Sequence, residues 1–190
     1  MKKIKAHKTY NTRRMVGTQI MLPSLNATGM LNTKNHQTGV FEYAEQVSGE
    51  RMHLYYNVKT KGCFGCVMPC NRYFVINKGR YKGLNAEGPE FESMGSFTSR
   101  ILNGDLESAL KCIDLCTEYG LDTISTSSAI SFSMECYDRG LIDIKTTQGL
   151  DLKWGNIDAV IELIHQIGKR EKYGAVLADG ILESIKRLGK

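Results

Sequence analysis

Three cysteines stand close together in the first half of the chain. Cys63, Cys66 and Cys70 follow a C-x2-C-x3-C spacing, with Gly65 and Pro69 between them. Glycine and proline favour a tight, non-helical path, so we expect the three sulfur atoms to converge on one point. Thiolates gathered in this way are soft ligands that usually hold zinc or an iron–sulfur cluster. The spacing therefore predicts a metal-binding loop.

The spacing favours an iron–sulfur cluster over zinc. Zinc sites usually contain two C-x2-C pairs, or one pair followed by spaced histidines, and neither pattern follows the run 61–72. Three close cysteines with a distant fourth ligand suit a [4Fe–4S] cluster. The fourth ligand would be Cys112, Cys116, Cys136 or a residue outside this chain, although Cys112 and Cys116 fit core packing better. A set of buried cysteines that act only as small hydrophobic side chains is the less favoured alternative for the loop itself.

Two other segments carry residues with possible chemistry. The segment 87–92 concentrates three glutamates, Glu87, Glu90 and Glu92, around a turn. Carboxylates beside a redox centre can relay protons if burial raises their pKa, but composition alone favours a solvated acidic loop. The segment 118–123 places a glycine turn against an expected helix N-terminus, which attracts anions. An ordinary turn between two helices has the same sequence features and is the favoured interpretation.

The elements that must position these residues differ between the two halves of the chain. Residues 1–40 are rich in turn formers and show no lasting period, which predicts an extended segment. We expect a short helix over 41–47, and a strand or an irregular lead-in over 51–60. The run 73–76 predicts a strand that turns back through 77–81 as a short return strand.

From residue 105 onward the pattern is helical. Apolar residues at helical spacing and capping residues predict helices over 105–120 and 122–140, a third after Asn156 and a fourth after Gly174. The second helix is crowded with serine and threonine, which are poor helix formers, so close packing or polar contacts must stabilise it. The predicted fold is mainly α: a helical bundle over 101–190 with a short irregular and β part over 1–100.

Length and composition indicate one globular domain, residues 1–190. Hydrophobic residues make up 42% and charged residues 24% of the chain, which is ordinary for a soluble protein. No apolar run approaches the roughly 20 residues that a membrane span needs, and no apolar segment follows the basic N-terminus as in a secretory signal. Six cysteines, three of them clustered, are too few for a secreted disulfide scaffold, so we expect a reducing, cytoplasmic setting.

The formal net charge of +5 is modest, and the basic residues are spread along the chain. Spread charge is typical of a solvated surface, so we expect neither nucleic acid nor a membrane as a partner. A weak preference for an acidic partner protein fits this charge, and a ferredoxin is one such protein.

Taken in order, several motifs resemble the tungsten-dependent aldehyde:ferredoxin oxidoreductase family. The matching runs are C-F-G-C-x3-C-x-R at 63–72, G-P-E-F-E at 88–92, L-C-T-E-Y-G-L-D-T-I-S-T at 115–126 and M-E-C-Y-D-R-G-L at 134–141. Upstream, Gly17-Thr18 and the run 31–35 fall in the right order as well. The resemblance covers almost the whole chain.

This resemblance implies an enzyme that carries a bis-pterin tungsten, or molybdenum, centre beside a [4Fe–4S] cluster. Such enzymes oxidise small aldehydes to carboxylic acids and pass the electrons through the cluster to ferredoxin. A class of aromatic-ring reductases with the same cofactor is related to them. The resemblance also implies a role for seven residues: three cluster ligands, Cys63, Cys66 and Cys70; a proton-transfer carboxylate, Glu92; and one of two pterin-binding turns, Gly120, Leu121 and Asp122.

The sequence also departs from the family pattern. Thr117 stands where the pterin motif has aspartate, and Phe91 stands where tyrosine is common. The resemblance covers only the middle, mostly helical third of such an enzyme, without the segments that supply the other pterin contacts. We therefore expect a fragment or one piece of a split enzyme, whose other domains are separate chains. The alternative hypothesis is a non-catalytic remnant or interaction domain that binds zinc or an iron–sulfur cluster.

Overall fold

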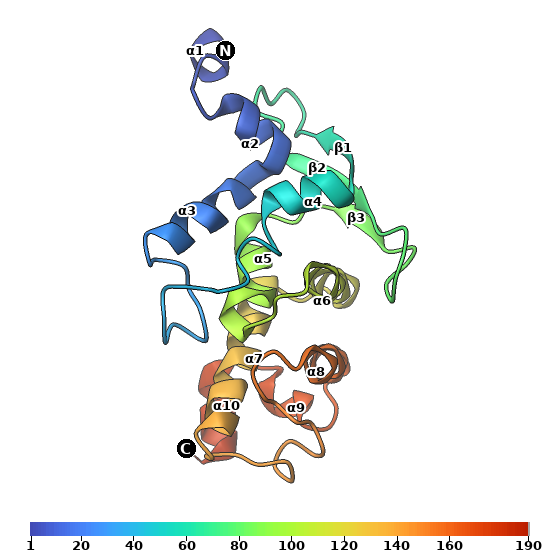
Figure 1. Ribbon diagram of the computed structural model, residues 1–190. Helices are drawn as coiled ribbons and strands as arrows, with labels where there is room; N and C mark the ends of the chain where they lie inside the picture. The colour runs from blue at the N-terminus through green and yellow to red at the C-terminus, as the bar shows by residue number, and fades with distance from the viewer. Residues whose placement is uncertain (190) are drawn as a thin grey trace.

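The computed structural model describes residues 1–189, the Asn57 side chain excepted. Figure 1 shows a small sheet and the N-terminal helices at one end and the C-terminal helices at the other, with α5 between them. The helices, in chain order, are α1 (Lys2–Lys5), α2 (Tyr10–Val16), the 3-10 helix η1 (Gly17–Ile20), α3 (Met21–Ala27), α4 (Gly49–Tyr55), α5 (Phe91–Phe97), the 3-10 helix η2 (Ser99–Ile101), α6 (Leu106–Tyr119), α7 (Thr123–Asp138), α8 (Ile157–Lys169), α9 (Gly174–Leu177) and α10 (Ile181–Leu188). The prediction of a mainly helical fold is confirmed.

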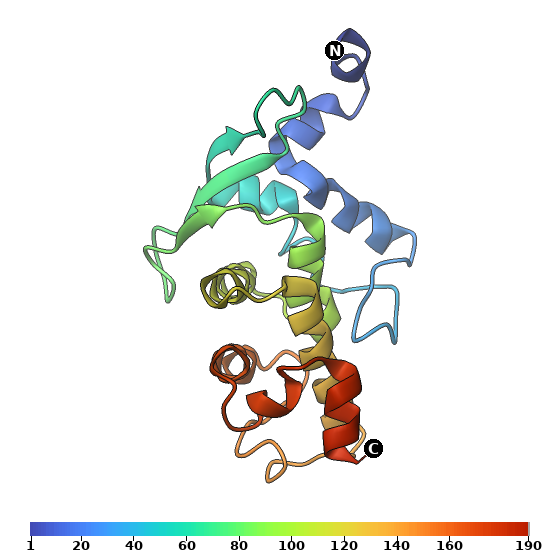
Figure 2. The same ribbon diagram turned by 180° about the vertical axis from the view of Figure 1, so that it is seen from behind.

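The sheet has three antiparallel strands in the order β1-β2-β3. They are β1 (Asn57–Lys61), β2 (Asn71–Val75) and β3 (Asn85–Glu87). Helix α4 lies against one face of this sheet, in front of it in Figure 1 and behind it in Figure 2. Lys61 pairs with Asn71 at the end of β1 and β2, so the sheet closes the base of the loop that carries the three cysteines.

Capping residues set the ends of the long helices where the sequence predicts them. The Asp105 side chain accepts hydrogen bonds from the first turn of α6, and Gly120 ends that helix with a φ of 66°. Asp122 and Asn156 cap α7 and α8 in the same way as Asp105 caps α6. The three predicted helices of residues 105–170 are therefore confirmed.

The serines of α7 form the polar contacts that the sequence requires. Ser127 Oγ donates to the Ser96 carbonyl, and Ser131 Oγ donates to the side-chain oxygen of Asn35. The Ser133 hydroxyl lies 3.1 Å from the hydroxyl of Tyr173. Because these bonds join α7 to α5, to the segment after α3 and to α9, the poor helix propensity of serine is offset by tertiary contacts.

Five predictions about the elements are wrong. Residues 51–55 belong to α4 instead of a strand or an irregular lead-in, and residues 77–81 form no return strand, since the third strand is β3 at 85–87. Residues 41–47 form turns, and the helix begins at Gly49 because Ser48 Oγ accepts from the Arg51 N–H. Residues 10–27 form α2, η1 and α3 instead of an extended segment, and buried contacts at Val16 and Leu22 anchor these short helices. The last helix is divided into α9 and α10.

The main core lies between the helices, with α5 and η2 at its centre. Met94, Phe97 and Ile101 are fully buried there. Cys112, Cys116 and Cys136 are buried in the same core, as packing predicts for the first two. Within residues 1–189, no helix is both long and apolar enough to cross a membrane.

Candidate metal and cofactor site

The cysteine loop connects β1 to β2 across residues 62–70. A turn closes between Cys63 and Cys66, where the Cys66 N–H donates to the Cys63 carbonyl at 3.0 Å. Gly65 has a φ of 70°, so glycine is required at this point of the turn. Cys63 and Cys66 are exposed and Cys70 is half-buried, and all three are free thiols. The loop therefore presents soft donors at the protein surface.

The expected convergence of the three sulfur atoms stays a prediction. Among residues 1–189, no three Cys, His, Asp or Glu side chains are arranged to hold a metal ion. The thiols do lie near enough to interact, because the charges of Cys63 and Cys66 add to the burial that raises the pKa of Cys70. Three free thiols on one loop fit the donor set of a zinc or iron–sulfur site.

A buried arginine supports the base of the loop. Arg72 is 1% exposed, and its guanidinium donates to the carbonyls of Val16 and Cys70, each at 2.6 Å. A Cβ at position 17 would lie 1.4 Å from Arg72 Nη2, so only glycine leaves room there for the guanidinium. Burial lowers the pKa of Arg72, which nevertheless stays charged at neutral pH because arginine titrates so high.

Thr18 links this arginine to the acidic run. The Thr18 hydroxyl donates to the Glu90 carboxylate and accepts from the Phe91 N–H, the first N–H of α5. The Glu90 charge acts on both Arg72 and Cys70, and it raises the pKa of each. Glu90 is thus the carboxylate of the acidic run whose charge acts on Cys70 itself, whereas Glu87 contacts Lys61 and Asn71 at the base of the loop.

Glu92 lies two residues further on, in the first turn of α5 near the start of α7. Its side chain is exposed, and the neighbouring Ser93 hydroxyl lies 3.0 Å from the Thr123 hydroxyl at the start of α7. Glu92 and Ile124 line the same small cavity of about 120 Å³. The predicted catalytic carboxylate and the predicted pterin turn are therefore neighbours.

The pterin turn itself has the geometry of a tight connection between two helices. The Leu121 N–H donates to the Cys116 carbonyl at 2.7 Å, and Asp122 accepts from the Ser125 N–H at 2.6 Å. That hydrogen bond holds the pKa of Asp122 below its usual value. Gly120 and Asp122 are exposed, so the turn is accessible from solvent.

Together these contacts form a continuous path, which we call the contact path. It runs from Cys70 through Arg72 to the Val16–Thr18 segment, from Thr18 to Glu90, and from α5 through Ser93 to Thr123. Hydrogen bonds between segments as much as 72 residues apart in sequence join the predicted metal loop to the predicted pterin turn.

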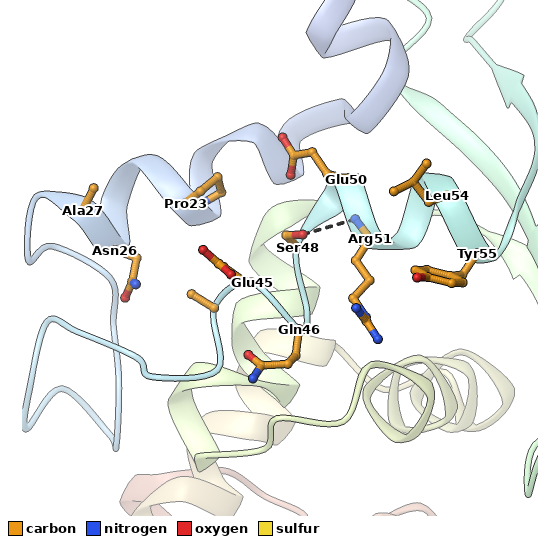
Figure 3. A pocket seen from close by; sticks show the side chains of 11 residues that line it. Pro23, Asn26, Ala27, Glu45, Gln46, Ser48, Glu50, Arg51, Leu54 and Tyr55 are labelled. Atoms are coloured by element: carbon orange, nitrogen blue, oxygen red, sulfur yellow. Dashed lines mark hydrogen bonds between the residues drawn. The ribbon is translucent and has the colours of Figure 1, made fainter.

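A cleft of about 770 Å³ lies elsewhere. Figure 3 shows it between α3, the turns before Ser48, and α4, where Ser48 bonds to the Arg51 N–H. Of the site residues that the sequence predicts, none lines this cleft. Its size therefore says nothing about the predicted chemistry.

Sequence reasoning missed Arg72 and Glu90 as members of this site. Arg72 was visible as the last residue of the C-x3-C-x-R run, and Glu90 as one of three clustered glutamates. Neither signal reveals that the two side chains interact, because they stand on β2 and before α5.

The fold and the site together define a helical domain that carries a cysteine loop beside a helix-terminal turn. The family model described as aldehyde ferredoxin oxidoreductase, domains 2 and 3, matches residues 1–190. The chain therefore belongs to the aldehyde ferredoxin oxidoreductase family.

Individual relatives agree with this assignment. The chain is 38% identical over 168 residues to the tungsten-containing aldehyde ferredoxin oxidoreductase of Pyrococcus abyssi, covering 86% of this chain and 27% of the relative. It is 28% identical over 127 residues to the WOR-like subunit of an aliphatic sulfonate oxidoreductase from Pyrococcus furiosus, covering 67% of this chain and 20% of that one. This chain thus spans about a quarter of the length of such relatives.

One solved structure has the same fold. The BamBC active-site complex of benzoyl coenzyme A reductase, solved with 1,5-dienoyl-CoA, matches with a TM-score of 0.71 at 18% sequence identity. The match covers 93% of this chain and 26% of the other. It supports the mainly helical architecture with a small antiparallel sheet.

Proposed function

We propose that this chain is the cluster-holding part of a tungsten- or molybdenum-pterin oxidoreductase, which oxidises aldehydes to carboxylic acids and passes the electrons to ferredoxin. The single observation that carries the proposal is the contact path. In a member of this family, the path joins three thiols suited to iron to a turn and a carboxylate suited to a second cofactor. A protein contributes to cofactor chemistry by binding and orienting the cofactors, and the contact path fixes the two predicted binding segments relative to each other.

Each predicted site residue has a definite task in this proposal. Cys63, Cys66 and Cys70 bind the [4Fe–4S] cluster, which supplies one-electron transfer when bound. The turn 120–122 binds one pterin through its exposed backbone, next to the N-terminus of α7. The fourth cluster ligand and the remaining pterin contacts come from outside this chain, because Cys112, Cys116 and Cys136 are buried in the core.

Glu92 serves as the proton-transfer group. It is an exposed carboxylate in the first turn of α5, and it lines the small cavity beside the pterin turn. A carboxylate in that place can take a proton as the aldehyde is oxidised. Aldehydes are proposed as substrates on the basis of the relatives named for them.

The charge distribution supports an acidic electron carrier such as ferredoxin as the partner. Basic residues are spread along the chain, but acidic residues are not: residues 1–82 contain fourteen lysines and arginines against three acidic residues. Figure 1 shows most of these residues, in blue to cyan-green, at the end of the molecule that carries the sheet and the cysteine loop, although Lys34 and Arg80 reach to α7 and α8. Phe64, fully exposed between Cys63 and Cys66, adds an apolar contact point. Opposite charge steers such partners together.

We propose that the chain works with further domains, which belong to the same polypeptide or to separate ones. The chain spans 27% of the Pyrococcus abyssi relative, so three quarters of that enzyme has no counterpart in it. Coding regions that match the remaining domains, on either side of this reading frame, would support a split enzyme. Their absence from the genome would contradict it.

We also propose a second candidate function, a non-catalytic metal-binding or interaction domain. In the described chain, residues 1–189, the loop thiols do not form a ready-made group of three metal ligands. A zinc ion or an iron–sulfur cluster would then order the loop without any connection to catalysis.

Metal content distinguishes the two functions. The chain is purified anaerobically from its native host, and its metals are measured by mass spectrometry. About four iron atoms per chain, with tungsten or molybdenum and co-purifying polypeptides, are expected of the oxidoreductase. Iron without tungsten or molybdenum would contradict the pterin part of the proposal and support only electron transfer by this chain. Zinc, or no metal, would overturn it in favour of the second candidate.

A further inference from the structure

Arg72 is the largest fully buried side chain among residues 1–189. It stands on β2, two residues after Cys70, and its guanidinium points back to the carbonyls of Cys70 and Val16. The protein keeps space for it, since the Cβ of any residue other than glycine at position 17 would overlap its Nη2 atom. Such an arrangement holds the guanidinium in one place.

The buried charge has no carboxylate partner in direct contact. None of the ion pairs formed within residues 1–189 involves Arg72. Its two bonds go to neutral carbonyls, and its Nε has no hydrogen-bond partner. Glu90 acts on it only at longer range and is already engaged by Thr18. A buried cation without an ion pair is costly, which indicates that a further anionic group belongs nearby.

The cysteine loop supplies such a group when it binds metal. Thiolates carry negative charge as metal ligands, and Cys70 is tied to Arg72 through its own carbonyl. We propose that Arg72 is a positioning residue for the metal–thiolate centre: it fixes the Cys70 end of the loop against α2 and balances the negative charge of the bound cluster. This inference rests on the proposed function, because it requires the cluster.

The two parts of this role have different consequences. Fixing the loop requires only the hydrogen bonds, whereas balancing charge requires the cation. Reduction adds an electron to the cluster, so a fixed positive charge beside it favours the reduced state. Removing that charge therefore makes the cluster harder to reduce, and a purely structural arginine would leave the potential of the bound cluster unchanged.

The test is the midpoint potential of the cluster, measured by a redox titration followed by electron paramagnetic resonance. The wild-type chain, purified anaerobically with its co-purifying polypeptides, is compared with Arg72→Met, Arg72→Lys and the control Arg80→Met. Arg80 is an exposed arginine that pairs with Asp158 on α8, away from the loop. We expect Arg72→Met to lower the equilibrium constant for one-electron reduction about tenfold, which corresponds to about 59 mV. Arg72→Lys, which keeps the charge, and Arg80→Met should each change that equilibrium constant by less than about threefold.

Each outcome decides the inference. A potential in Arg72→Met equal to that of the wild-type chain would overturn it while leaving the proposed function intact. If Arg72→Met binds no iron, iron content replaces the potential: retention by Arg72→Lys supports the charge role, and equal loss in both variants contradicts it. A wild-type chain without a cluster would refute the proposed function, and this inference with it.

Discussion

Two carboxylates of the acidic run, Glu90 and Glu92, have different surroundings although they stand two residues apart. Glu90 accepts a hydrogen bond from Thr18 and faces the charges of Arg72 and Cys70. Glu92 is exposed and lines a cavity beside the pterin turn. Within the first turn of α5, Glu90 therefore faces the cysteine loop and Glu92 faces the small cavity.

Glu92→Gln should reduce turnover of the complete enzyme by about 10² to 10⁴, the usual range for loss of a general acid–base. Glutamine keeps the size of the side chain but cannot exchange a proton. Iron and tungsten content should stay at the wild-type level, because Glu92 is not among the proposed metal ligands. Turnover and metal content are measured on the same preparation.

Glu87→Gln is the matched control for this substitution. Glu87 belongs to the same acidic run, but its carboxylate pairs with Lys61 on the sheet. Its replacement should leave turnover near the wild-type value. An equal turnover in Glu92→Gln and wild type would remove Glu92 from the mechanism.

At the scale of the elements, the site depends on where short helices begin. Helices α5 and α7 start beside each other, and Ser93 joins them through Thr123. The α7 start is fixed by its cap, since Asp122 accepts the Ser125 N–H. Another link joins the end of α4 to the start of α6, where the Tyr56 hydroxyl donates to Glu107 at 2.9 Å. The Asp122 cap and the Tyr56 hydrogen bond each lead to a stability prediction.

Asp122→Ala should lower the free energy of unfolding by about 1 kcal/mol at neutral pH, as the loss of an N-cap usually does. The cap bond holds the pKa of Asp122 below its usual value of 3.8. Its stabilisation is therefore fully present above that value and is lost as the pH falls through the lower pKa of the folded state. Urea unfolding should show a lower free energy of unfolding for Asp122→Ala at neutral pH and no difference from the wild type at acid pH. Glu118→Ala, which removes an exposed carboxylate of the preceding turn without removing a cap, should show little deficit.

Tyr56 contributes stability that is lost at alkaline pH, whereas the contribution of Asp122 is lost at acid pH. Burial, followed by the hydrogen bond to Glu107, raises the pKa of Tyr56 to about 12 from 10.0. A raised pKa stabilises the fold below the unfolded value of 10.0, and this contribution is lost between pH 10 and about 12. Tyr56→Phe should therefore be about 1 kcal/mol less stable at pH 8, with the difference closing at high pH. Urea unfolding curves of Tyr55→Phe, an exposed neighbour, should match the wild type throughout; a constant deficit in Tyr56→Phe at all pH values would contradict the assignment.

At the scale of the whole molecule, many of the basic residues lie at the end that carries the cysteine loop. Residues 1–82, most of which lie at the end that carries the cysteine loop, hold fourteen lysines and arginines against three acidic residues, while seventeen of the twenty acidic residues follow residue 82. Such a separation creates an oriented field, and it favours approach of an acidic carrier to the loop end. The opposite end is built from α8, α9 and α10 and packs around its own part of the core (Figure 2).

Electron transfer from the complete enzyme to ferredoxin should slow steeply with added salt. The screening length falls from about 10 Å at 0.1 M to about 3 Å at 1 M ionic strength, so the steering field weakens. Stopped-flow rates should also fall several-fold in Lys59→Glu, an exposed residue of β1 beside the loop, and stay unchanged in Lys153→Glu. A rate independent of salt would contradict charge steering.

Several features of this protein were determined by the sequence alone. The caps Asp105, Asp122 and Asn156 fixed the starts of the long helices because a cap and a helical period act within a few residues. The motif order identified the family, which the comparisons confirm. The roles of the site residues, including Cys63, Cys66, Cys70 and Glu92, stay predictions.

Tertiary structure decided the rest. The helices of residues 10–27 and the helix after Ser48 are too short to be stable by local propensity, and buried contacts with distant segments hold them. The same is true of the contact path, whose bonds from Arg72 to Val16 and from Thr18 to Glu90 span 56 and 72 residues. Sequence periodicity describes neighbours along one element, so a charge balance made between elements becomes visible only when the chain is folded.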